Sequence, residues 1–206
     1  CVYMLERSFP KFEGVGRGRF GKWLAAKTFL VAADDADRFE KELNIWIDLV
    51  VPYVVPLLSV TRIDGQLCAI MPLYACSLDD VLASGSTVRR LRALSFTSSA
   101  VQCLSQAYEK YDVLHLDLKP GNLLLRQPDS NVVYVGDWGI ARILNKPLSV
   151  LRGRQWRPAT TLDTSLAAGT LPYMSPERIV GLKPDIRDDI YSLGLILCQL
   201  LSGSFP

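Results

Sequence analysis

The sequence HLDLKPGN at residues 115–122, followed by DWG at residues 137–139, decides the fold. The two stretches bring together two carboxylates, one amine and one amide: Asp117, Lys119, Asn122 and Asp137. A carboxylate can accept a proton, an ammonium group can stabilise developing negative charge, and carboxylate and amide oxygens are ligands for Mg²⁺. The alternative is a polar turn in which Asp117 and Asn122 only cap the loop.

The first stretch resembles the catalytic loop of protein kinases, and the second resembles their metal-binding turn. Asp, Lys and Asn at three fixed offsets arise by chance about once in 10⁴ starting positions, taking each residue type at about 5%. The resemblance implies that Asp117 orients an acceptor hydroxyl and takes its proton, with Lys119 beside the transferring phosphoryl group. It also implies that Asn122 and Asp137 hold Mg²⁺.

Two further stretches follow in the order of the family. GTLPYMSPE at residues 169–177 resembles the segment that closes a kinase activation loop. DIYSLG at residues 189–194 resembles the start of the central helix, whose Asp189 would tie down the backbone of the catalytic loop. The chain is therefore similar to the protein kinase superfamily of eukaryotic type, with motifs running from about residue 115 to residue 206.

This resemblance implies an α+β, bilobal fold. Residues 1–72 would form a small β-rich lobe with one helix, and residues 73–206 a mainly helical lobe. The chain begins with Cys rather than Met, and Ser204, Phe205 and Pro206 follow an apolar stretch without a closing element. We therefore expect a chain cut at both ends, with an incomplete large lobe.

In the first half, LAAK at residues 24–27 resembles the strand whose Lys binds the nucleotide phosphates. This interpretation makes Lys27 a nucleotide ligand; a solvated edge position is the alternative. Its expected partner is Glu42 on the next helix, with Glu40 as the alternative. By resemblance, Met71 gates an adenine pocket that Leu73 and Tyr74 line, although core packing alone would explain Met71 equally well.

The glycine-rich loop is the weakest part of the resemblance. Gly16, Gly18 and Gly21 match G-x-G-x-x-G, but too few residues separate Gly21 from Lys27 for a strand, a turn and another strand. We therefore place the nucleotide loop at residues 5–10, where Leu5, Arg7 and Pro10 would stand in the glycine places. Side chains there would crowd the approach of the backbone to phosphate, and proline offers no N–H group.

Leu116 is a second departure, because it stands where the family usually has an arginine that receives an activation-loop phosphate. Phosphorylation at Thr160, Thr161 or Thr164 should therefore matter less for switching. The basic group at residues 152–157 reads as a solvated loop, with phosphate binding as the alternative.

The remaining elements follow from capping and periodicity. Ser77 and Asp80 have the spacing of a capping box and predict the start of a helix. Short strands are expected at residues 123–125 and 132–135, and a buried helix at residues 189–201. A longer helix is indicated by apolar and aromatic residues at helical spacing: Leu94, Val101, Leu104, Tyr108 and Tyr111.

Composition excludes other classes of protein. The 206 residues carry 23 Lys+Arg and 21 Asp+Glu, a net charge of +2, which argues against binding to nucleic acid through bulk electrostatics. No apolar stretch reaches the roughly 18–20 residues of a membrane span. The five cysteines are never spaced C-x-x-C, are mostly set among apolar residues and read as buried free thiols, which favours the cytoplasm or another reducing compartment.

The sequence thus predicts an ATP-dependent Ser/Thr protein kinase that uses Mg²⁺ and a protein substrate. Lys119, two residues after Asp117, is the choice typical of the Ser/Thr branch. The alternative is a pseudokinase that binds nucleotide or serves as a scaffold, which the missing glycines favour. Substrate, pathway and oligomeric state stay open.

Overall fold

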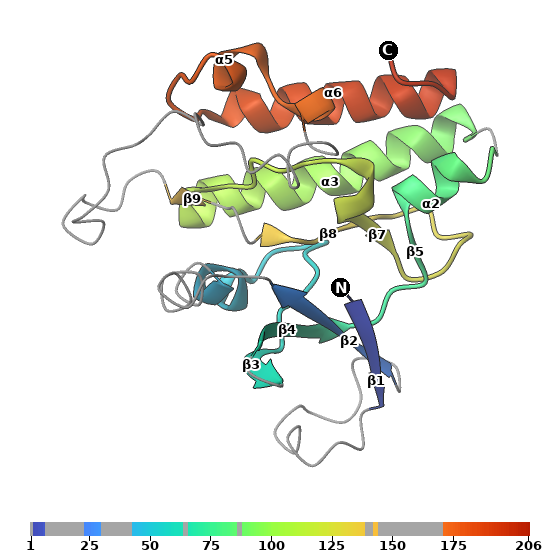
Figure 1. Cartoon of the computed structure of the whole chain (residues 1–206). Coiled ribbons are helices and arrows are strands. Elements are labelled where there is room, and N and C mark those ends of the chain that lie inside the picture. The colour runs from blue at the N-terminus through green and yellow to red at the C-terminus, as the bar shows by residue number, and fades with distance from the viewer. Residues whose placement is uncertain are drawn as a thin grey trace.

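The computed structural model describes residues 2–6, 23–29, 43–63, 66–85, 88–138, 142–143 and 171–206. The fold is α+β, as the sequence predicts. A four-stranded antiparallel sheet lies at one end of the molecule, and two long helices lie side by side at the other (Figure 1).

The sheet has the order β1-β2-β4-β3. Its strands are β1 (Val2–Glu6), β2 (Trp23–Phe29), β3 (Ser59–Ile63) and β4 (Gln66–Pro72). Alternate side chains of β2 and β4 point to opposite faces of the sheet. Ala25, Ala69 and Met71 join the main core, whereas Leu24 and Ile70 form a small separate cluster on the other face. Both faces of the two inner strands are therefore buried.

The predicted start of the nucleotide loop is wrong. Leu5 and Glu6 lie in β1, where they pair with Leu24 and Trp23 of β2. Lys27 pairs with Val2, at the other end of β1. Strand β1 therefore ends opposite Trp23, which lies four residues before Lys27 on β2. Four residues of a strand span about 13 Å. Residues 7–10 and the glycines at 16, 18 and 21 lie outside the described residues.

A helical segment at residues 43–48 packs on the sheet, where the sequence predicts the helix of the small lobe. Its buried residues are Leu43 and Trp46, and the indole Nε1 of Trp46 donates to the carbonyl of Val55 at 2.6 Å. Ile47 and Val50, which follow Trp46 in the chain, are exposed. Leu43 and Trp46 therefore define the buried face of this segment.

Helix α2 (Leu78–Ala83) begins as predicted. Ser77 is its N-cap, and its Oγ accepts from the amide of Asp80 at 3.2 Å. The Asp80 carboxylate accepts from the Ser77 amide at 2.7 Å in return. These two bonds satisfy amide groups that the first turn would otherwise leave unpaired, which fixes where the helix starts.

Helices α3 (Arg90–Tyr111) and α6 (Ile186–Ser202) confirm the two predicted long helices, but not the predicted faces. Leu94 and Val101 of α3 are about half exposed, whereas Ala93, Ala100 and Ala107 are buried. Leu104 of the predicted stripe is buried, together with Phe96 and Cys103, so the buried face of α3 coincides with the predicted stripe only in part. Helix α6 also differs from the buried helix we expected, because one of its sides is exposed: Ile190, Tyr191 and Leu201.

Short strands connect the sheet to the helices. Strand β7 (Leu123–Leu125) has the predicted bounds, and β8 (Tyr134–Val135) is shorter than expected. Both form a sheet with β5 (Cys76–Ser77) in the order β5-β7-β8. Val135 also exchanges backbone hydrogen bonds with Tyr53 and Val55, at 2.7 and 2.9 Å. The segment after the helix of residues 43–48 is thus tied to β8.

Four cysteines lie in the described residues, and all four are free thiols. Cys68 and Cys103 are buried, as predicted, and Cys76 is partly buried. Cys198 is exposed, so the prediction of a buried thiol is wrong for this residue. Burial raises the pKa of the Cys103 thiol far above its ordinary value. Within the described ranges, none of the helices is both long and apolar enough to cross a membrane.

Candidate active site

The predicted catalytic loop connects β6 (Val113–Leu114) to β7, and a 3₁₀ turn η3 (Pro120–Asn122) lies near its end. Asp189 of α6 fixes the start of this loop. Its two carboxylate oxygens accept the backbone N–H groups of His115 and Leu116, both at 2.8 Å. The contact predicted for Asp189 is therefore present.

Asp189 is only 2% exposed, and burial raises the pKa of its carboxyl group. The two amide hydrogen bonds and the nearby positive charge of Arg178 offset part of that increase. A buried carboxylate with both oxygens bonded is costly to remove, because two buried N–H groups would lose their acceptors.

His115 joins the loop to the metal-binding turn. Its Nδ1 accepts the N–H of Asp117 at 3.2 Å, so the ring proton lies on Nε2 and is donated to the carbonyl of Gly136 at 2.9 Å. The ring meets Trp138 edge-on, with 4.6 Å between the ring centroids. The Trp138 indole in turn donates to the carbonyl of Val135 at 3.1 Å. Residues 136–138 are therefore held against the loop.

Asp117 is buried, and its two oxygens differ in their contacts. The Oδ2 atom accepts from Lys119 Nζ at 3.0 Å and from Asn122 Nδ2 at 3.1 Å. The same Asn122 nitrogen also donates to the Asp117 carbonyl at 2.7 Å. The Oδ1 atom is buried and has no hydrogen-bond partner among the described residues. One oxygen is thus anchored, while the other is left to accept from a further group.

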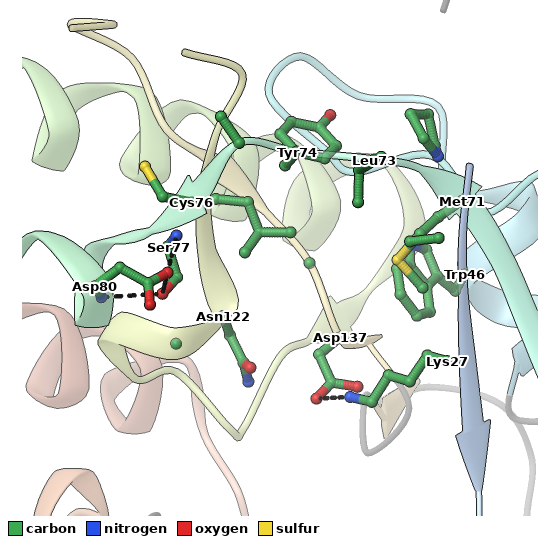
Figure 2. A pocket seen from close by; sticks show the side chains of 16 residues that line it. Lys27, Trp46, Met71, Leu73, Tyr74, Cys76, Ser77, Asp80, Asn122 and Asp137 are labelled. Carbon is green, nitrogen blue, oxygen red and sulfur yellow. Dashed lines mark hydrogen bonds and ion pairs between the residues drawn. The ribbon is translucent and has the colours of Figure 1, made fainter. Parts of the chain in front are cut away.

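Asp137 and Lys27 lie on the same side of the pocket, and their side chains form an ion pair (Figure 2). Asp137 has a φ of 64°. This left-handed conformation is unfavourable for a residue with a side chain and occurs mostly where the surroundings impose it, often at functional sites. Glu42, the predicted partner of Lys27, lies outside the described residues.

A pocket of about 300 Å³ opens between the four-stranded sheet and the segment that precedes α2. Figure 2 shows Lys27, Asn122 and Asp137 on one side of it and Leu73 and Tyr74 on the other. Burial raises the pKa of the Tyr74 phenol to about 12, so the phenol stays neutral. The pocket has an apolar part and a polar end. The polar end carries the side-chain oxygens of Asn122 and Asp137, which can bind a metal ion, and the amine of Lys27.

The structure brings most of the predicted site residues together. Five of them line the pocket: Lys27, Met71, Leu73, Asn122 and Asp137. Asp117 and Lys119 adjoin it through the contacts of Asn122. Trp46 and Cys76 also line the pocket, although neither is among the predicted site residues. Trp46 could have been identified from the sequence, because a bulky side chain four positions after Glu42 has the spacing of one helical turn.

Comparison with known proteins gives matches over most of the chain. The protein kinase domain family matches residues 13–206. A serine/threonine-protein kinase PknH from Mycobacterium tuberculosis is 30% identical over 208 residues, which cover 93% of this chain and 31% of the relative. A serine/threonine-protein kinase PknB from Mycolicibacterium smegmatis is 31% identical over 130 residues, or 63% of this chain and 19% of the relative. A serine/threonine-protein kinase pkn2 from Myxococcus xanthus is 29% identical over 173 residues, or 83% of this chain and 20% of the relative. This chain spans between about a fifth and a third of the length of these relatives.

Proposed function

Because this chain belongs to the protein kinase family, we propose that it is a Ser/Thr protein kinase that transfers the γ-phosphoryl group of Mg-ATP to a protein hydroxyl. The names of its relatives, which are serine/threonine-protein kinases, support the substrate class. We take residues 1–72 as the small lobe and 73–206 as the large lobe, with the pocket between them. The free thiols suit a reducing compartment, which we propose as its location.

The unpartnered Oδ1 atom of Asp117 carries the proposal. Lys119 and Asn122 fix the other oxygen, so the free one has a defined direction. A hydroxyl group that donates to it is oriented for attack and has an acceptor for its proton. Lys119 lies beside the same carboxylate and places positive charge where the transferred group would pass.

The donor set suits Mg²⁺. Within the described residues, no group of three or more His, Cys, Asp or Glu side chains gathers at one point. Magnesium is usually held by one or two carboxylates together with substrate phosphates, rather than by a cage of protein ligands. Asn122 and Asp137 supply an amide and a carboxylate oxygen on the same side of the pocket. Bound there, Mg²⁺ would neutralise phosphate charge during transfer.

The apolar part of the pocket suits an adenine ring. The N–H groups of Leu73 and Ala75 donate to the carbonyls of Trp23 and Leu125, at 3.3 and 2.9 Å. Tyr74 lies between these two hydrogen bonds, and its backbone N–H and C=O groups can form hydrogen bonds with the edge of an adenine base. Met71 and Leu73 supply apolar surface for the ring, and Lys27 lies at the end where the phosphates would be.

A scaffold without transfer is the second candidate. The sequence favours it through the side chains that stand in the glycine places of the nucleotide loop. Of these, Leu5 lies in β1, whereas Arg7 and Pro10 lie outside the described residues. The ion pair between Lys27 and Asp137 is the observation that favours the scaffold, because it engages a carboxylate that the metal requires.

The test is transfer of labelled γ-phosphate from Mg-ATP to a mixture of Ser, Thr and Tyr peptides. We expect transfer to Ser or Thr, and an Asp117→Asn rate lower by about 10²- to 10⁴-fold, because the general base is lost. The affinity for ATP, measured by calorimetry, should change less than about twofold, since Asp117 does not line the pocket. Asp129→Asn makes the same chemical change at an exposed position and should leave the rate unchanged.

An unchanged rate in Asp117→Asn would contradict the assignment of the base. A folded wild-type chain that binds Mg-ATP but transfers nothing would support the scaffold instead.

A further inference from the structure

Arg178 reaches the catalytic loop from a distant part of the chain. It lies in α5 (Pro176–Ile179), directly after the Ser-Pro-Glu segment. Its Nη1 atom donates to the carbonyl oxygen of Leu116, 62 positions earlier in the chain. Leu116 is the residue before Asp117, so this bond acts on the peptide group that leads into the proposed base.

That peptide group is held at both of its polar atoms. Arg178 binds its carbonyl oxygen, and its N–H, which belongs to Asp117, donates to His115 Nδ1 at 3.2 Å. The preceding peptide group is held as well, because the Leu116 N–H donates to Asp189 at 2.8 Å. The plane of the peptide before Asp117 is therefore set by contacts with two other residues.

The conformation of Leu116 explains why such contacts are needed. Its φ is 64°, a left-handed backbone that is unfavourable for a residue with a side chain. Leucine also has no polar group that could hold its own carbonyl. Without an external donor, the peptide group could relax to a more favourable orientation. Rotation of this plane would move the Asp117 carboxylate relative to Asn122, and misplacement of a reacting group by about 1 Å can cost 10²-fold in rate.

The position of α5 determines whether Arg178 can make this contact. Ser175 caps α5, with its Oγ accepting the Arg178 amide at 3.2 Å, and the same hydroxyl donates to Asp188 of α6. The start of α5 is thus fixed to α6 by a buried hydrogen bond. Arg178 and Asp189 then approach the Leu116 residue from two different helices.

We propose that Arg178 is a positioning residue, which holds the peptide before Asp117 and couples the Ser-Pro-Glu segment to the catalytic loop. This inference rests on the proposed function, since it concerns the same site. Leu116 supplies no positive charge to the catalytic loop. The guanidinium of Arg178 instead brings a positive charge to the loop backbone, at the carbonyl of Leu116.

The experiment compares Arg178→Met, Arg178→Lys and the control Arg187→Met. Methionine keeps much of the apolar stem but removes all donors, whereas lysine keeps a donor and the charge. Arg187 is an arginine of α6 whose side chain is 83% exposed and forms an ion pair with Asp185 at 2.8 Å. For each variant, kcat and the KM for ATP are measured, together with amide hydrogen exchange of the peptide that covers residues 114–119.

We expect Arg178→Met to lower kcat by about 10- to 100-fold, while the KM for ATP changes less than about twofold. In Arg178→Met, amide hydrogen exchange of residues 114–119 should become about tenfold faster than in the wild type. Arg178→Lys should recover most of the rate, and Arg187→Met should match the wild type in both measurements. A role in stability alone would not give this recovery or this separation of kcat from KM.

Arg178→Met with wild-type kcat and wild-type exchange would overturn the inference. If Arg178→Met does not fold, Arg178→Lys decides. The inference then requires that Arg178→Lys retains part of the wild-type kcat and that the amides of residues 114–119 exchange more slowly in it than in the unfolded chain. A wild-type chain that transfers no phosphate would contradict the proposed function instead, and the exchange of residues 114–119 alone would then decide whether Arg178 holds this peptide.

Discussion

Replacing Asp189 by asparagine tests how the central helix supports the catalytic loop. The carboxylate accepts two N–H groups, from His115 and Leu116, each at 2.8 Å. Asparagine has the same shape but only one accepting oxygen, and its NH₂ group would face the second N–H. One buried amide would therefore lose its acceptor and oppose another donor.

The expected loss of stability follows from these contacts. A hydrogen bond to a charged group contributes about 1.5–3 kcal/mol, and a buried unsatisfied N–H costs about 1–3 kcal/mol. Part of this is offset, because asparagine removes the cost of burying a charge, which is what raises the pKa of Asp189. We therefore expect the free energy of unfolding to fall by about 2–4 kcal/mol, or about 4–16 °C in Tm for a chain of this size.

Denaturant unfolding at pH 7, followed by tryptophan fluorescence, measures this loss. Trp138, one of the four tryptophans of the chain, is buried and meets the ring of His115, so part of the emission change reports on the catalytic loop. Asp129→Asn is the matched control at an exposed site and should stay within about 0.5 kcal/mol of the wild type. If Asp189→Asn were equally close to the wild type, the two hydrogen bonds could not be what fixes the loop.

Three further predictions test other contacts. Lys27→Met should slow transfer at saturating ATP by about 10- to 100-fold while the chain stays folded, as measured by kcat and circular dichroism, because the phosphates lose their positioning group. Ser175→Ala should lower the free energy of unfolding by about 1–3 kcal/mol in denaturant titration, because α5 loses its cap and Asp188 loses a donor. Hydrogen bonds from Ser77 lower the pKa of Asp80, so this carboxylate stabilises the fold above its unfolded pKa of about 3.9 and loses the effect as pH falls through the lower folded value. The difference in stability between wild type and Asp80→Asn should therefore shrink between pH 6 and pH 2.5, and a constant difference would contradict the assignment.

Local features of the sequence predicted their structures well. The capping box of Ser77 and Asp80 and the strand at residues 123–125 appear where the sequence placed them. The capping box depends on residues that are three apart in the chain, so it forms within the helix itself. The strand is marked by a run of three leucines, although its partners are β5 and β8. The hydrogen bonds from the catalytic loop to Asp189 could also be predicted, because a sequence motif marks that residue.

Packing between distant segments could not be predicted in the same way. The buried face of α3 includes three alanines and Ser99, whereas Leu94 and Val101 are half exposed, and the hydrophobic pattern of α3 alone does not indicate this. The left-handed backbones of Leu116 and Asp137 are imposed by surrounding contacts rather than by glycine. Arg178 was missed for the same reason, since an arginine after Ser-Pro-Glu gives no sign that it binds a carbonyl 62 residues earlier.

The position of Asp117 therefore depends on three separate parts of the chain. Helix α6 holds the loop through Asp189, the turn after β8 holds it through His115, and α5 holds it through Arg178. Leu116 has no charge with which to bind a phosphate, so a phosphate on the segment before α5 would have to act through another group or by moving α5. Since Ser175 already fixes α5 to α6 without any phosphate, we expect the transfer rate to be unchanged after treatment with a phosphatase. A rate that fell on dephosphorylation would mean that the contacts of Ser175 and Arg178 are not enough to hold the loop.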